Sequence, residues 1–193
     1  KKNVKISSDE FDLSGNEVKA YFEKDLYDII ILDAYDDVIF KFKNGANGKG
    51  NYLNFLILEN KLTIRGKDSY INFNDLKMYS DDSLIIDDSK KQFFLSGKNS
   101  KLITESLEII AESIEGKYEI VDNKNEIINL ILTDKKLVSI SEGLMEMFAK
   151  KAIYSKKNNL IELFSNVKII RNNETAIGDY AKINTIDNSY KII

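Results

Sequence analysis

Short apolar runs of four to seven residues, rich in Ile, Phe and Tyr, recur along nearly the whole chain, separated by clusters of Asn, Asp, Gly, Ser and Lys. This pattern is typical of β-strands joined by turns. No Pro-, Gly- or Ser-rich linker divides the 193 residues. We therefore expect a single all-β domain that spans residues 1–193.

Five segments share one pattern, in which apolar first and third residues enclose a variable second residue, and a small or turn-forming residue follows. Their third residues recur at spacings of 32, 31, 37 and 31 residues. Because strand side chains alternate between two faces, the apolar pairs are predicted to point inward and the variable residues, such as Thr63 and Glu162, outward. The inward pairs are Ile30, Leu32, Leu62, Ile64, Phe93, Leu95, Leu130, Leu132, Ile161 and Leu163.

A repeat of about 32 residues has room for two to four strands, which is too little to bury its own apolar face. Successive units must therefore stack to share one core, although alternating strands can also produce such spacings by chance. Residues 107–114 and 145–152 fit a helical face and a strand about equally well. Their place within the repeat favours strands.

The composition removes several kinds of chemistry, because the chain has no His, Cys, Pro or Trp. Zinc sites of the Cys/His kind, nucleophilic triads, redox CxxC motifs and disulfides all need residues that are missing. Carboxylate, Lys, Tyr or Ser chemistry remains, or no chemistry at all. We expect no metal and no cofactor.

The charge balance points to no strongly charged partner, since 28 basic residues stand against 31 acidic ones. Only Arg65 and Arg171 are arginines, the residue type that makes bidentate phosphate contacts, so a nucleic-acid partner is not expected. The amino terminus lacks the apolar stretch of a signal peptide. The sequence fits a soluble protein or the mature part of an exported one.

Three segments near the carboxyl end have a recognisable texture: Ala149-Lys150-Lys151-Ala152-Ile153-Tyr154, Leu163-Phe164-Ser165-Asn166-Val167-Lys168-Ile169 and Gly178-Asp179-Tyr180-Ala181-Lys182-Ile183. They resemble the OstA-like domain of the lipopolysaccharide-transport proteins LptA and LptC and of the amino-terminal part of LptD. Near the start, Ile6-Ser7-Ser8-Asp9 and Leu13-Ser14-Gly15-Asn16 look like the opening strands of that domain.

The resemblance is strongest over residues 140–193 and rests mainly on periodicity before that. Lys150 stands where the family commonly has Asp, and Ser165 stands where it has Gly. The weaker match leaves open a tandem, with a divergent LptC-like or LptA-like part over residues 1–140 and a clearer LptA-like part over residues 141–193.

The resemblance implies a partly open antiparallel β-jellyroll that carries lipopolysaccharide across the periplasm without catalysing a reaction. The acyl chains would lie in an apolar interior groove, lined by the inward residues of the repeat. Binding of acyl chains requires only the burial of apolar surface, which stabilises the complex by about 25 cal/mol per Å², and no particular polar residue. The resemblance also implies edge-to-edge joining to other Lpt-type proteins or to a second copy, and the last apolar run, with Tyr190 and Ile192, is the candidate edge.

Two other functions compete with the carrier. The first is a structural or adhesive β-solenoid, in which the same aliphatic residues fill a closed, dry core. The second is an enzyme that uses a carboxylate pair, for which Asp36-Asp37, Asp81-Asp82 and Asp87-Asp88 are the candidates. These acids follow strand-like runs and lack calcium-loop spacing, so we interpret them as turns. Residues 44–50 lack the spacing of a phosphate-binding loop and are predicted to connect a hairpin.

Overall fold

The computed structural model describes residues 4–24 and 28–193, and over these residues it contains strands and no helix. The all-β prediction is confirmed, and both ambiguous stretches, 107–114 and 145–152, lie in strands. The strands are β1 Val4–Ser7, β2 Phe11–Gly15, β3 Glu17–Phe22, β4 Ile29–Phe42, β5 Asn47–Leu56, β6 Lys61–Arg65, β7 Ser69–Phe73, β8 Leu76–Ser80, β9 Ser83–Asp87, β10 Gln92–Ile103, β11 Leu107–Val121, β12 Lys124–Glu142, β13 Met145–Ser155, β14 Leu160–Arg171, β15 Glu174–Asn184 and β16 Tyr190–Ile192.

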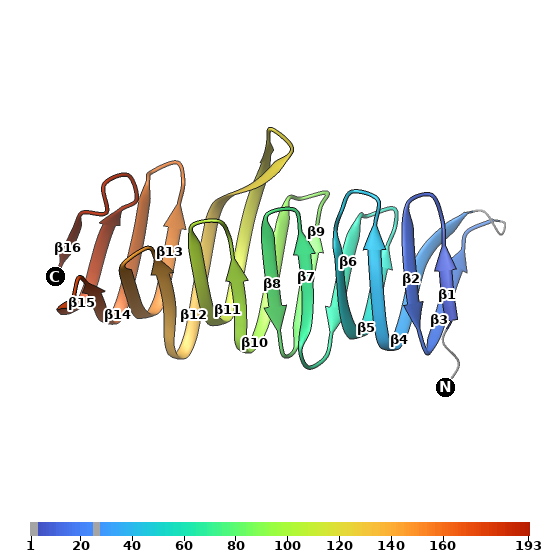
Figure 1. Cartoon of the computed structure of the whole chain (residues 1–193), viewed down its shortest axis with the longest axis horizontal. Coiled ribbons are helices and arrows are strands. Elements are labelled where there is room, and N and C mark those ends of the chain that lie inside the picture. The colour runs from blue at the N-terminus through green and yellow to red at the C-terminus, as the bar shows by residue number, and fades with distance from the viewer. Residues whose placement is uncertain (1–3, 25–27) are drawn as a thin grey trace.

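The strands form one antiparallel sheet that is folded into two layers (Figure 1). Two routes lead from β5 to β10: one passes through β6 and β9, the other through β7 and β8. The two halves of β5 and of β10 therefore belong to different layers. Layer A contains β1, β2, β7 and β8; layer B contains β3, β6, β9 and β16; the other strands bend and contribute one half to each layer.

The bends line up along one side of the molecule, which we call the spine. At the spine the strand register shifts, for example between Tyr35 and Val38 where β4 pairs with β5. Gly66, with φ of 122°, lies in the turn between β6 and β7, as predicted. Gly97 and Ser165, with φ of 140° and 63°, lie instead at bulges within β10 and β14, where the strand bends without ending. In the first segment the prediction was two residues early, because the bend lies at Asp36-Asp37, whose φ values are 57° and 53°.

The five repeat segments occupy equivalent positions in the fold. Each lies in layer B and runs toward the spine, in β4, β6, β10, β12 and β14. One repeat therefore crosses layer B, bends into layer A, reverses at a turn and returns. The longer spacing of 37 residues arises because the β11–β12 hairpin rises beyond the layers (Figure 1).

The interior between the layers is filled with side chains. Of the ten predicted inward residues, all except Ile30 are buried, with exposed fractions of 6% or less, and Ile30 is half-buried at the start of β4. Alternation therefore identified the core face of layer B. The matching face of layer A includes Ile71, Met78, Leu102, Ile109 and Met147, each with an exposed fraction of 0 or 1%.

The described strand pairs are all antiparallel, so the chain zigzags and does not coil as in a β-solenoid. Residue 140, the boundary of the tandem that the sequence left open, lies within β12. Because β12 pairs with both β11 and β13, the sheet continues without a break at that position. The predicted connection at residues 44–50 is the β4–β5 hairpin, with β5 beginning at Asn47. The two ends of the sheet lie at opposite ends of the molecule (Figure 1).

Candidate functional site

Opposite the spine, the hairpin turns of the two layers face each other along a line that we call the mouth. The turns at residues 43–46, 74–75 and 104–106 belong to layer A, and those at 57–60, 88–91 and 156–159 belong to layer B. Three hollows follow one another along the mouth, each lined by residues of both layers. The mouth is therefore the side on which the interior meets solvent.

The amino-terminal part of the mouth is aromatic. Phe42 of layer A and Phe55 of layer B meet edge to face across the mouth, with ring centroids 5.0 Å apart, and Phe11 lies 6.2 Å from Phe42. Alternation along β4 and β5 turns both Phe42 and Phe55 inward, just before each strand reaches its turn. Such aromatic pairs stabilise a fold by about 0.5–1.5 kcal/mol in addition to the free energy gained by burying their apolar surface.

The two hollows beside these rings are small, with volumes of about 10 and 40 Å³. Both are lined by Phe42 and Phe55, and the larger also by Leu62, Phe73 and Ile86. Ligand pockets usually hold about 300–1,000 Å³. In this conformation the predicted groove residues all lie in layer B and, apart from Ile30, pack in one core with the buried residues of layer A. The two hollows beside the aromatic rings are therefore too small to hold a ligand.

A contact between the layers closes the mouth beyond the aromatic part. The ring of Phe73 in layer A meets the ring of Tyr118 in layer B edge to face, with centroids 5.5 Å apart. The Tyr118 hydroxyl donates a hydrogen bond of 2.5 Å to Asp88, and burial together with this bond raises the pKa of Tyr118. The Asn125 side-chain amide donates a 3.4 Å hydrogen bond to the Phe73 carbonyl oxygen.

The third hollow is larger, about 340 Å³, and lies under the β11–β12 hairpin. Leu76, Leu107, Ile127 and Tyr154 supply apolar surface, and Lys124, Glu126 and Lys156 supply charge. Asn125 is buried there, and its Oδ1 has no hydrogen-bond partner. The carboxyl of Glu142, directly opposite Leu107 in the β11–β12 register, also has a buried oxygen without a partner, and burial raises its pKa.

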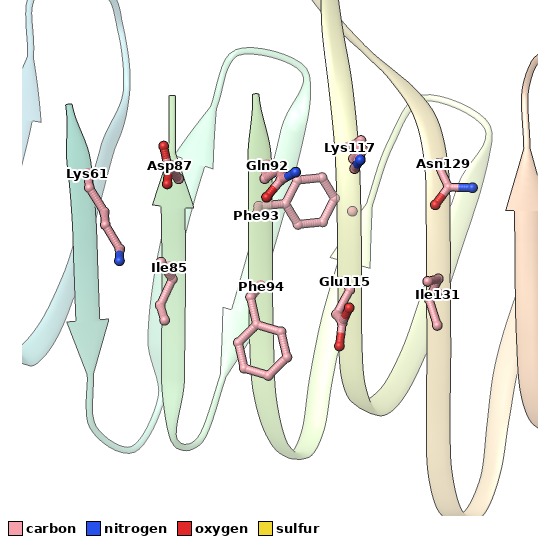
Figure 2. Close-up of a pocket in the computed structure, with 11 residues that line it drawn as sticks. Lys61, Ile85, Asp87, Gln92, Phe93, Phe94, Glu115, Lys117, Asn129 and Ile131 are labelled. Atoms are coloured by element: carbon pink, nitrogen blue, oxygen red, sulfur yellow. The ribbon is translucent and has the colours of Figure 1, made fainter. Parts of the chain in front are cut away.

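A separate pocket of about 310 Å³ lies on the outer face of layer B, on the far side from the interior (Figure 2). Its lining residues Ile85, Phe94 and Ile131 alternate with buried residues along β9, β10 and β12, so they point away from the core. No sequence motif indicated this pocket.

The three acidic pairs do not come together. Asp81 and Asp82 lie at the spine, where they accept hydrogen bonds from Asn99 and Ser96. Asp87 accepts bonds from Lys90 and Ser89 at the β9–β10 turn, and these bonds lower the pKa of Asp87 to about 2. Within the described ranges, no group of three or more acidic side chains could hold a metal ion.

These features define an antiparallel β-jellyroll, folded along one side around an apolar interior. No model of a protein family and no curated protein matches the sequence. Among solved structures, the chain is similar to LptH from Pseudomonas aeruginosa, the LptA homologous periplasmic component of that organism's conserved lipopolysaccharide transport device. The TM-score is 0.52 at 12% identity, covering 62% of this chain and 82% of that chain.

The likeness to LptH establishes the shared fold, and the β-jellyroll implied by the OstA-like resemblance is confirmed. The identity is too low for the comparison to carry over a binding site. Over the residues that the structure describes, we find no helix that could span a membrane.

Proposed function

We propose that this protein is a non-enzymatic periplasmic carrier of lipopolysaccharide, which takes acyl chains between its two layers through the mouth. The observation that carries the proposal is the continuous apolar interior between the layers of a fold shared with LptH. The residues proposed to meet the acyl chains are the inward residues of layer B, from Ile30 to Leu163, together with Phe42 and Phe55 at the mouth.

Lipid entry requires the layers to part at the mouth, because the hollows beside Phe42 and Phe55 are too small for an acyl chain. The ladder hydrogen bonds run between strands of the same layer, so opening about the spine leaves them intact. Opening breaks mainly side-chain contacts, such as Phe42 with Phe55 and Phe73 with Tyr118. The acyl chains cover the apolar surface that opening exposes, and this burial stabilises the complex by about 25 cal/mol per Å² of apolar surface.

The ends of the sheet support the proposed joining of neighbours. In the described sheet β1 pairs only with β2, and β16 only with β15, so each end presents an edge strand. Tyr190 and Ile192 lie opposite Ile183 and Ala181 and are half-buried. An unpaired edge can take up a strand from another β-jellyroll or from a second copy.

Photo-crosslinking tests lipid entry at the mouth. We expect p-benzoylphenylalanine in place of Phe42 or Phe55 to trap lipopolysaccharide in cells that make it. The matched control replaces Phe164, which lies on the outer face of layer B beside Tyr180, with ring centroids 5.2 Å apart. Equal trapping at residues 55 and 164 would contradict a lipid site between the layers.

Cell fractionation of the gene product tests the proposed periplasmic location. Recovery of the protein in the cytosolic fraction would contradict that location.

The packed interior favours a second function, a structural or adhesive protein with a closed, dry core. Nine of the ten predicted groove residues are buried by other parts of the protein itself. Native mass spectrometry separates the two functions, because a carrier purified from cells retains lipid and a protein with a closed core does not. Lipid-free protein that also fails to bind added lipopolysaccharide would favour the second function.

A further inference from the structure

The pocket on the outer face of layer B is built from two straight rows of side chains (Figure 2). Directly paired residues of consecutive strands form each row. The row nearer the mouth is polar and runs through Lys61, Asp87, Gln92, Lys117 and Asn129. The row nearer the spine is mostly apolar and runs through Ile85, Phe94, Glu115 and Ile131.

The charges of the pocket cancel, which indicates a neutral ligand. Lys61 and Lys117 are balanced by Asp87 and Glu115, so an anion or a cation would meet as many like charges as opposite ones. Gln92 adds an amide that both donates and accepts hydrogen bonds. Asn129 adds an amide oxygen that accepts them, while its nitrogen donates to the Tyr154 carbonyl oxygen. A ligand that satisfies this row must itself carry many donors and acceptors, which is the chemistry of hydroxyl groups.

The apolar row requires the same ligand to have an apolar face. Phe94 lies between Ile85 and Glu115 in the row, is half-buried and lines the pocket, so part of its ring is accessible there. A pyranose ring has hydroxyl groups around its rim and a face of C–H groups. Its face can lie on Phe94 and Ile131 while its hydroxyl groups reach the polar row, a combination that an acyl chain cannot offer.

The length of the rows favours a chain of sugar rings over a single ring. The polar row crosses five neighbouring strands and the apolar row four, which at the usual strand spacing gives lengths of about 19 and 14 Å. A peptide would need free backbone groups for strand addition, but β9, β10 and β11 are paired on both sides. The Asp87 carboxylate of the polar row is also fixed in place, because Lys90 and Ser89 donate hydrogen bonds to it.

We propose that this outer pocket is a binding site for a linear, neutral oligosaccharide, with Phe94 as the platform for one sugar ring and Asp87, Gln92 and Asn129 as hydrogen-bonding partners of its hydroxyl groups. The site lies on the opposite side of layer B from the interior. The proposal therefore stands or fails independently of the proposed lipid carriage.

The test is to titrate the purified protein with cellopentaose, maltopentaose or chitopentaose and to record the NMR chemical shifts of its backbone amides at each step. We expect at least one of these probes to bind with micromolar to millimolar affinity and to shift amides of β9, β10 and β11. Phe94→Ala should weaken that binding at least about tenfold, and Gln92→Ala should weaken it several-fold. Phe164→Ala, on the same outer face but outside the pocket, should leave it unchanged.

Three outcomes would overturn the assignment. The first is absence of binding by all three probes at millimolar concentration. The second is binding that Phe94→Ala and Phe164→Ala weaken equally, because the pocket would then not be its location. The third is a dimer in solution that Phe94→Ala dissociates, which would place a second copy of the chain on this face.

Discussion

Gly116 lies opposite Phe93 in the β10–β11 register, and we expect Gly116→Ala to destabilise the protein strongly. An ideally placed Cβ at residue 116 would lie closer than 3.0 Å to three atoms of the Phe93 ring, a separation that folded proteins do not show. Phe93 has an exposed fraction of 3%, and its ring stacks on Tyr118 with centroids 6.4 Å apart. Tyr118 is itself held by Phe73 and Asp88, so the Phe93 ring has little room to move.

Overpacking a filled core typically costs about 1–3 kcal/mol, and the restrained ring places Gly116→Ala near the upper end, at about 2–3 kcal/mol. For a chain of this length that corresponds to a fall in Tm of about 5–10 °C. Thermal unfolding followed by circular dichroism measures the change. Because Phe93→Leu removes the ring atoms involved, the double variant should be more stable than the sum of the single changes predicts. An unchanged Tm for Gly116→Ala, or strictly additive effects, would refute this packing argument.

Three other changes test separate contacts. Asp87→Asn should lower Tm above pH 4 but hardly near pH 2. Hydrogen bonds from Lys90 and Ser89 lower the pKa of Asp87 from 3.8 to about 2, so the stabilisation by the ionised carboxylate is lost as the pH falls through that range. A difference in Tm between the two proteins that does not change with pH would contradict this reasoning. Tyr118→Phe removes the bond to Asp88 and should cost about 1–3 kcal/mol in urea unfolding, whereas no loss would mean that the bond is not formed. Ser165→Val, at φ 63°, should cost about 1–2 kcal/mol in the same assay, and an unchanged midpoint would exclude strain at this bend.

The strands and the inward face of layer B could be predicted from the sequence because both depend on local alternation. Leu62 and Ile64 flank Thr63, and this spacing alone assigns the first two to the core. The bends at Gly66 and Gly97 could also be predicted, since glycine readily takes the positive φ that both positions require. The repeat pattern placed the first bend two residues early, at Ala34, whereas the acidic pair Asp36-Asp37, interpreted as a turn, marks its position.

The contacts across the mouth could not be predicted, because they join residues far apart in the chain. Phe73 meets Tyr118 only after the sheet has folded along the spine. The outer pocket was missed for a similar reason, since its rows appear only when the registers of five strands are known. Aromatic residues one or two positions before a turn, such as Phe42, were the available signal for the mouth.

The central claim is that the layers part at the mouth to admit lipid, and locking the mouth tests it most directly. The chain has no cysteine, so Phe42→Cys with Phe55→Cys creates a unique pair that a short bis-maleimide can join across the layers. Phe164→Cys with Tyr180→Cys is the matched control within layer B. We expect lipopolysaccharide binding to fall at least about tenfold when the mouth is locked and to persist in the cross-linked control. Undiminished binding by the locked protein would contradict the account.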